Sequence, residues 1–139
     1  MSDDDTSWQF IGAHRFRIEP PDVVIFQEVG DVWPDEMRAI YEVLRRLAED
    51  MGTPAFCIND TSRLGDLPSE SRKIAATSGI LAQVRALAVV VTGFRQRILA
   101  KLVISAAMLG MRSGTVPPIG FFATEQEARD WVATLRRVE

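Results

Sequence analysis

The side chains that could bind or react with another molecule gather in two short polar segments, each of which follows an apolar run. One segment follows residues 55–59 and the other follows residues 86–91. In open α/β sheets, ligands bind beyond the carboxyl ends of the strands, where the first backbone N–H groups of the next helix are free. We therefore expect the two segments to form a binding rim for a ligand or a partner. Its candidate residues are Asp60, Thr61, Ser62, Arg63, Ser69, Thr92, Gly93 and Arg95.

A structural role would account for several of the same residues. Thr61, Ser62 and Asp66 belong to residue types that cap helices and stabilise turns through their side-chain oxygens. The turn at Thr92 and Gly93 is no phosphate-binding loop, because it has one glycine and no Gly-Lys-Ser or Gly-Lys-Thr follows it. The sequence leaves both interpretations of the rim open.

Catalytic chemistry has few candidate residues in this chain. His14 is the only histidine and Cys57 is the only cysteine. Cys57 stands in an apolar run, where a thiol is normally buried and unreactive. No cluster of His, Cys and carboxylate residues has the spacing of a metal site. We expect a protein that is not an enzyme and needs no cofactor; a small hydrolase that uses His14 and Cys57 is the remote alternative.

The composition is that of an ordinary globular domain. The chain has 139 residues, 47% of them hydrophobic, and a net charge of −3, so we expect no binding to nucleic acid. The most apolar stretch, residues 86–110, is interrupted by Gly93 and by basic residues, which argues against a membrane span. Residues 1–7 are acidic and polar, and we expect a disordered tail there without a secretory signal. Residues 8–139 then form one domain, for which we expect a cytoplasmic location.

The spacing of apolar residues predicts strands and helices in alternation. Strands show a period of two or a short apolar run, and helices show apolar residues three and four positions apart. We expect strands at residues 14–18, 23–29, 55–60, 86–91 and 119–122, and helices at residues 34–51, 68–81, 94–109 and from 124 onward. This order is typical of an α/β fold with a single mixed sheet of about five strands and about four helices. An antiparallel pair at the N-terminus would precede parallel strands.

Two local patterns give more detailed expectations. Residues 86–91 should form the central buried strand of the sheet. Phe94, Ile98 and Leu102 recur every fourth residue and predict the buried face of the helix that follows. Thr124 and Glu127 have the spacing of a capping box, in which each side chain accepts a hydrogen bond from the backbone N–H of the other residue.

Three stretches together resemble the SpoIIAA-like branch of the STAS-like proteins: residues 23–36, residues 85–91 and residues 122–132. The resemblance covers the chain from about His14 onward. It implies a mixed sheet with helices packed against it, as in STAS domains and in the lipid-binding half of Sec14-like proteins. Such domains are mainly non-enzymatic, and in the anti-sigma-factor antagonists a partner kinase phosphorylates a serine at the start of the second helix. Ser69 stands in that region here, but the surrounding Asp-Ser-Ser-Gly motif is missing.

The resemblance leads to two expectations about function. The first is a bacterial regulatory or interaction module that binds a protein partner through the rim, with homodimerisation as a further option. The second is a carrier or sensor of a small hydrophobic, lipid-like ligand or of an anionic ligand. A hydrophobic ligand would occupy an internal cavity lined by Ile98, Leu102 and Met108.

Overall fold

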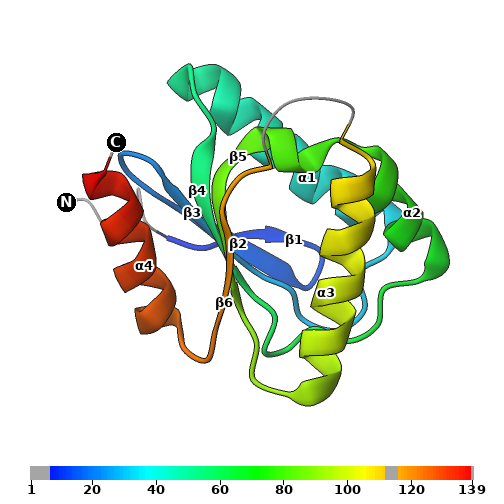
Figure 1. Ribbon diagram of the computed structural model, residues 1–139. Helices are drawn as coiled ribbons and strands as arrows, with labels where there is room; N and C mark the ends of the chain where they lie inside the picture. The colour runs from blue at the N-terminus through cyan, green and yellow to red at the C-terminus, as the bar shows by residue number, and fades with distance from the viewer. Residues whose placement is uncertain (1–6, 112–115, 139) are drawn as a thin grey trace.

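The computed structural model describes residues 7–111 and 116–138, which form a six-stranded mixed sheet with helices on both faces (Figure 1). The strands are β1 (Gln9–Ile11), β2 (His14–Glu19), β3 (Val23–Gln27), β4 (Ala55–Asp60), β5 (Val84–Val90) and β6 (Ile119–Phe122). The helices are α1 (Pro34–Met51), α2 (Ser69–Thr77), the short 3₁₀ helix η2 (Ile80–Gln83), α3 (Phe94–Leu109) and α4 (Glu125–Arg137). This architecture confirms the α/β fold with one mixed sheet and four helices.

The strands lie side by side in the order in which they occur in the chain, from β1 to β6. β1, β2 and β3 are antiparallel, whereas β3 to β6 are parallel. The register places Phe26 of β3 beside Asn59 of β4, and Asn59 beside Val89 of β5. Because side chains alternate between the two faces of a strand, these three residues share one face of the sheet.

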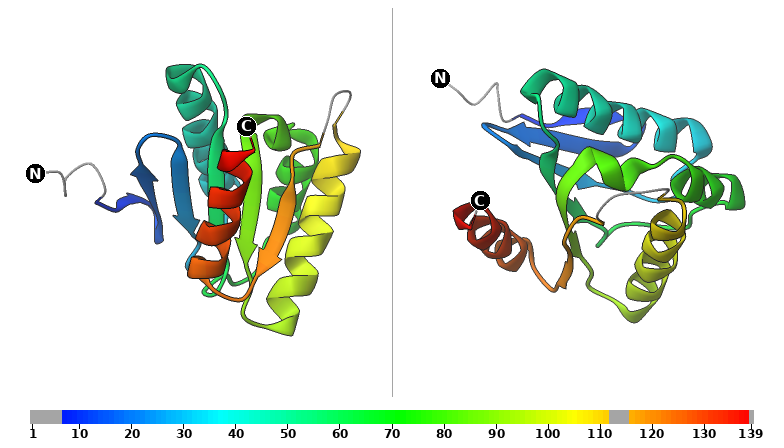
Figure 2. Two further views of the ribbon diagram at one scale, coloured as in Figure 1. Left: turned by 60° about the vertical axis from the view of Figure 1, so that its left-hand side comes forward. Right: turned by 45° about the horizontal axis from the view of Figure 1, so that its top comes forward.

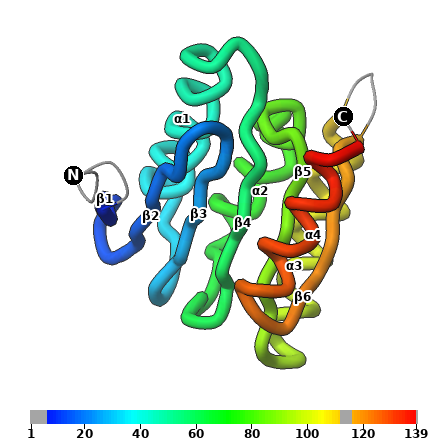
Figure 3. The backbone as a smooth tube through the Cα atoms, turned by 90° about the vertical axis from the view of Figure 1, so that its left-hand side faces the viewer, coloured from blue at the N-terminus to red at the C-terminus, as the bar shows by residue number. Residues whose placement is uncertain are grey.

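The helices are divided unequally between the two faces (Figures 2 and 3). α1, η2 and α3 cover one face and enclose the larger hydrophobic core, in which α1 buries Met37, Ile40 and Leu44. α4 alone covers the opposite face, where Ala128 and Val132 are buried in the smaller core. A space between the sheet and its helices can therefore exist on the face that α1, η2 and α3 cover.

The helix boundaries follow local signals. The Glu36 carboxylate accepts a hydrogen bond from the Trp33 N–H at 3.0 Å, which caps the start of α1, and Gly52 ends the helix in the left-handed region at φ 75°. At α4, Thr124 Oγ1 accepts from the Glu127 N–H at 3.1 Å as predicted. The Glu127 carboxylate accepts from the Ala123 N–H at 3.0 Å. The capping box is thus displaced by one residue on that side.

The expectation for residues 94–109 is right in extent but wrong in orientation. Phe94 is 79% exposed and Leu102 is 61% exposed, and Ile98 is also exposed. The buried side of α3 carries Ala100 and Ala107 instead. α3 is apolar around most of its circumference, so four-residue spacing alone does not distinguish the buried side from the exposed one.

Three further differences from the sequence expectations are small. β1 has only three residues, too few to show a period, and it adds a sixth strand by pairing with β2. The centre of the sheet lies at β3 and β4, because only β6 lies beyond β5. Gly79, in the left-handed region at φ 69°, separates α2 from η2, so the helix expected at residues 68–81 is divided in two. Most of the expected tail, residues 1–6, lies outside the described residues.

Candidate functional site

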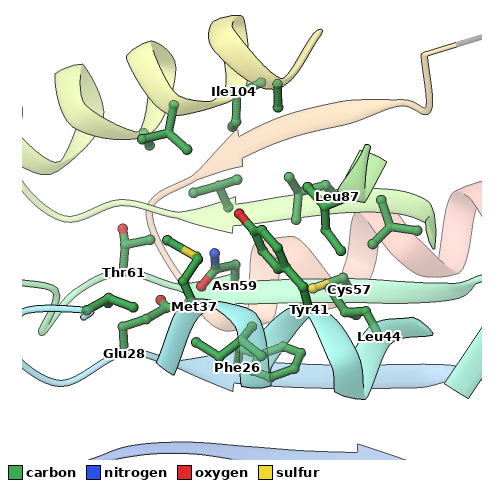
Figure 4. A pocket seen from close by; sticks show the side chains of 18 of the residues that line it. Phe26, Glu28, Met37, Tyr41, Leu44, Cys57, Asn59, Thr61, Leu87 and Ile104 are labelled. Carbon is green, nitrogen blue, oxygen red and sulfur yellow. The ribbon is translucent and has the colours of Figure 1, made fainter. Parts of the chain in front are cut away.

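A pocket of about 120 Å³ lies between the sheet and the helices that cover its larger core. β3, β4 and β5 form its floor, and α1, η2 and α3 form its walls (Figure 4). Most of the side chains that line it are aliphatic or aromatic, such as Phe26, Leu44 and Leu87. Because an engineered apolar cavity of about 150 Å³ binds benzene, this pocket has room for a ligand of roughly that size.

Several polar side chains interrupt this apolar lining. Glu28 follows β3 on the same face as Phe26, and Asn59 and Thr61 belong to the matching face of β4 and the residue after it. In Figure 4 the Glu28 carboxyl and the Asn59 amide lie at the same end of the pocket, and Tyr41 reaches in from α1. The pocket therefore has an apolar body and one polar end.

Two buried oxygens at the polar end, Glu28 Oε1 and Asn59 Oδ1, have no hydrogen-bond partner among the described residues. Glu28 is only 7% exposed. Burial raises its pKa to about 8; its own backbone N–H opposes this rise, and the negative charge of Asp60 adds to it. The carboxyl is therefore mostly protonated at neutral pH. An unsatisfied buried polar group costs about 1–3 kcal/mol, so the polar end is unfavourable unless another molecule pairs with it.

The remaining polar groups of the pocket are uncharged. Thr61 Oγ1 donates a hydrogen bond to the Val90 carbonyl oxygen at 2.7 Å, which ties the end of β4 to β5. Burial, together with the nearby Glu28, raises the pKa of the Tyr41 hydroxyl and of the Cys57 thiol. Cys57 consequently stays a thiol at neutral pH, whereas a nucleophilic cysteine must be a thiolate.

His14 is fully engaged in structural hydrogen bonds. Its Nε2 lies 3.0 Å from Glu36 Oε1, and its Nδ1 accepts from the Val29 N–H at 2.9 Å. The ring therefore joins β2 to the segment after β3 and to the start of α1, and neither nitrogen is left to act as a base toward Cys57. Within residues 7–111 and 116–138, no group of three His, Cys, Asp or Glu residues could hold a metal ion. No helix in the same residues is long and apolar enough to cross a bilayer.

The two segments of the predicted rim meet at one point. Arg95, in the first turn of α3, forms an ion pair with Asp66 in the loop before α2. Thr92 and Gly93 immediately precede α3, with Gly93 as its N-terminal cap residue. The chain therefore brings both segments to the same edge of the sheet, and binding there stays a prediction.

The other rim residues take part mainly in local contacts. Asp60 accepts hydrogen bonds from the Gln27 side-chain amide and the Ser62 N–H, both at 2.9 Å. The Arg63 carbonyl oxygen accepts from the Gly30 N–H at 2.9 Å, while its side chain is exposed. Ser69 is exposed at the first residue of α2. Of the predicted rim residues, only Thr61 also lines the pocket.

The outer side of α3 carries a second, shallower hollow. It has a volume of about 330 Å³ and lies over Phe94, Ile98, Leu102 and the Arg95–Asp66 pair. An internal cavity lined by Ile98, Leu102 and Met108 was expected, and that expectation is wrong, because all three side chains are exposed. α3 instead contributes Ala100, Val103, Ile104 and Ala107 to the internal pocket.

Several solved structures match this architecture, including the two that follow. One is an uncharacterized protein of the DUF3478 family from Shewanella loihica PV-4, with a TM-score of 0.62 and 17% identity over 86% of this chain and 91% of that one. The other is the anti-sigma factor antagonist SpoIIAA in its unphosphorylated form, with a TM-score of 0.59 and 14% identity over 91% and 98%. This chain has the SpoIIAA-like fold. At these identities the likeness shows the fold alone, and neither a family model nor a curated protein sequence matches the chain.

Sequence reasoning missed both residues of the polar end. A signal for them exists, because Glu28 continues the alternation of Val24 and Phe26, and Asn59 continues that of Ala55 and Cys57. A carboxyl and an amide at positions that alternation assigns to a buried face indicate a polar site inside the core. In this chain, strand parity therefore places Glu28 and Asn59 on the face of the sheet that forms the floor of the pocket.

Proposed function

We propose that this SpoIIAA-like chain is a non-catalytic module that binds a small, largely apolar ligand between its sheet and helices α1 and α3. The observation that carries the proposal is the pocket of about 120 Å³ in which two buried oxygens lack partners. Natural cores are packed with few voids larger than a water molecule, and buried polar groups are usually paired. A ligand would remove both exceptions at once, since it would fill the void and pair with the polar end.

The states of Cys57 and His14 support the non-catalytic part of the proposal. Cys57 is held as a thiol by burial, and both ring nitrogens of His14 are occupied. Nucleophilic catalysis needs a nucleophile within hydrogen-bond reach of a base. Binding followed by release, or binding that alters a partner's affinity, needs neither group.

Benzene is a suitable first probe, because its size matches the apolar body of the pocket. Ala100→Leu would add about three carbons inside the pocket, whereas Leu102→Ala would change the exposed side of the same helix. We expect benzene at 100 times its dissociation constant to add about 2.7 kcal/mol to the stability of the wild type and of Leu102→Ala. Ala100→Leu should lose that gain. Thermal unfolding with and without benzene measures this gain in stability. If benzene does not stabilise the wild type, the proposal is contradicted.

A second candidate function, binding of a protein partner, is favoured by the exposed side of α3. Phe94, Leu102 and Leu109 are 79%, 61% and 88% exposed, and exposed apolar groups that gather on one element mark interaction surfaces. Arg97 and Lys101 on the same helix are also exposed. We infer a partner that presents an apolar surface with acidic residues around it, because two copies of this basic helix would repel each other.

A designed amphipathic helical peptide tests this second candidate. Its apolar face would carry leucines, and its flanks would carry Glu in one version and Lys in the other. We expect the Glu version to bind, the Lys version to bind at least tenfold more weakly, and Leu102→Asp to abolish binding. Equal binding of both peptides would contradict the inferred charge preference. If the chain binds anionic vesicles but neither peptide, the occupant of this surface is a membrane and not an acidic protein. If sedimentation shows a stable dimer, the occupant is a second copy of the chain.

A further inference from the structure

The charges around the pocket are strongly one-sided. Glu28 is its only acidic lining residue, and none of the described lining residues is Lys, Arg or His. Titratable groups near the Glu28 carboxyl include Tyr41 from α1 and Cys57 and Asp60 from β4, none of which is a cation. His14 of the neighbouring strand β2 is also close, but its Nδ1 accepts from the Val29 N–H and its Nε2 lies 3.0 Å from Glu36 Oε1, so neither ring nitrogen is left for Glu28. α3, η2 and β5 contribute only apolar side chains to the lining. A buried carboxyl normally has a charged or hydrogen-bonding partner, and here the described chain supplies none for Glu28 Oε1.

The unpaired atoms at the polar end are both oxygens, and once Glu28 is ionised both are hydrogen-bond acceptors only. Glu28 Oε1 and Asn59 Oδ1 each offer lone pairs; Glu28 directly follows β3 and Asn59 belongs to the adjacent β4, and both residues lie on the same face of the sheet. A primary ammonium group has three donors and no acceptor, so it can satisfy two or three such oxygens from one position. A ligand carboxylate has no donor of its own, so beside the ionised Glu28 it would add a second negative charge and leave both acceptors unsatisfied.

We propose that the ligand is a small primary amine, whose apolar body fills the pocket and whose ammonium group pairs with Glu28 and Asn59. This inference rests on the proposed function, since it specifies the ligand class of the same pocket. The sequence left an anionic ligand as an option, and the amine proposal excludes such a ligand from the internal pocket. Fatty acids and other carboxylates should therefore bind far more weakly than amines of the same length.

Binding of an amine should release a proton. The Glu28 carboxyl has a pKa of about 8 in the empty pocket, while an alkyl ammonium group, like that of lysine, titrates near pH 10. At pH 7 the ammonium ion enters as a cation, and the carboxyl proton leaves to solvent, so about 0.9 proton is released per ligand bound. The apparent affinity should rise about 50-fold between pH 6 and pH 8 and then level off toward pH 9.

Isothermal titration of the full chain with n-butylamine, 1-butanol and butanoate tests the inference. At pH 8 we expect butylamine to bind at least tenfold more tightly than butanol, and butanoate not to bind. Glu28→Gln, which keeps the size of the side chain, should reduce butylamine affinity at least tenfold and leave butanol within threefold. Glu70→Gln on the exposed side of α2 is the matched control and should bind as the wild type does. Titration in two buffers of different ionisation enthalpy measures the proton release.

Each outcome separates the two proposals. If butanol and benzene bind and butylamine has no advantage, the pocket binds apolar ligands but the amine assignment is overturned. If none of the compounds binds, the proposed function fails together with the inference, and the pocket holds only water. If Glu28→Gln does not fold, the pH dependence and proton release of the wild type still decide the matter, because a flat affinity between pH 6 and pH 8 would refute the role of Glu28.

Discussion

Glu28 should make the empty protein less stable as the pH rises. Its pKa is about 8 in the folded chain, compared with the ordinary value of 4.5. Because the folded state holds the proton more tightly than the unfolded state, the stabilisation is complete below pH 4.5 and is lost as the pH rises toward 8. Integration between the two pKa values gives a loss of roughly 3 kcal/mol by pH 7 and roughly 5 kcal/mol by pH 9. Such a loss is a large part of the 5–15 kcal/mol typical of a folded domain.

The isosteric change Glu28→Gln isolates this contribution, because glutamine stays neutral at every pH. We expect the variant to gain stability relative to the wild type between pH 4 and pH 7 by about 3 kcal/mol, or roughly 12 °C in unfolding temperature for a chain of this size. Urea unfolding followed by circular dichroism at pH 4, 5.5, 7 and 9 measures it. Glu70→Gln should follow the wild type at each pH.

The test uses the difference in free energy of unfolding between Glu28→Gln and the wild type at each pH. Contributions from other titrating groups cancel in this difference, because those groups are the same in both proteins. A constant difference from pH 4 to pH 9 would refute the reasoning, because it would show that the Glu28 carboxyl titrates alike in the folded and unfolded chains. Butylamine supplies a second check. If it pairs with Glu28, saturating butylamine should remove most of the loss of wild-type stability between pH 7 and pH 9.

Three further predictions concern other parts of the chain. His14→Leu should lower the free energy of unfolding by about 1–3 kcal/mol in urea titrations, because it leaves the partly buried Val29 N–H without its acceptor. Arg129→Gln removes a two-bond ion pair with Glu19, whose pKa is lowered chiefly by its hydrogen bond from Arg129. The variant should be about 1 kcal/mol less stable at pH 7, and the difference should shrink as the pH falls below 4.5. Ser69→Ala should leave the affinity for the Glu-flanked peptide unchanged within twofold by fluorescence titration, and a larger change would revive the phosphorylation switch.

The sequence predicts most elements of this fold because they have local signals of their own, whereas the three-residue β1 has none. Pro34, the acidic first turn and Gly52 delimit α1 as predicted, and the alternation of strands and helices indicates parallel pairing from β3 onward. The face that each helix covers depends on contacts between distant residues, which no local pattern records. α3 is the clearest case, since Phe94 and Leu102 look as apolar as Val103 and Ala107 but lie on the exposed side.

The candidate site was less accessible to sequence reasoning for a related reason. Polar residues after strands are common, and most of those in the predicted rim, such as Asp60, form local hydrogen bonds. The pocket depends on the distance between α3 and the sheet, which is a property of packing rather than of spacing in the chain. Glu28 was detectable in principle through its strand parity, but its missing partner became visible only once α1 and β4 were placed beside it.

The strictly sequential order of the strands has a consequence for folding during synthesis. Each new strand pairs with the one made just before it, so the sheet can grow in step with the ribosome, without waiting for a distant partner. The two faces of the sheet are not covered by helices at the same time, however. The first face is covered as α1 and α3 emerge, whereas Ile25, Phe56 and Ile58 on the second face have no helix over them until residues 125–137 are made. The nascent chain must therefore expose an apolar sheet surface throughout most of its synthesis, and chaperones that hold unfinished chains should recognise that surface.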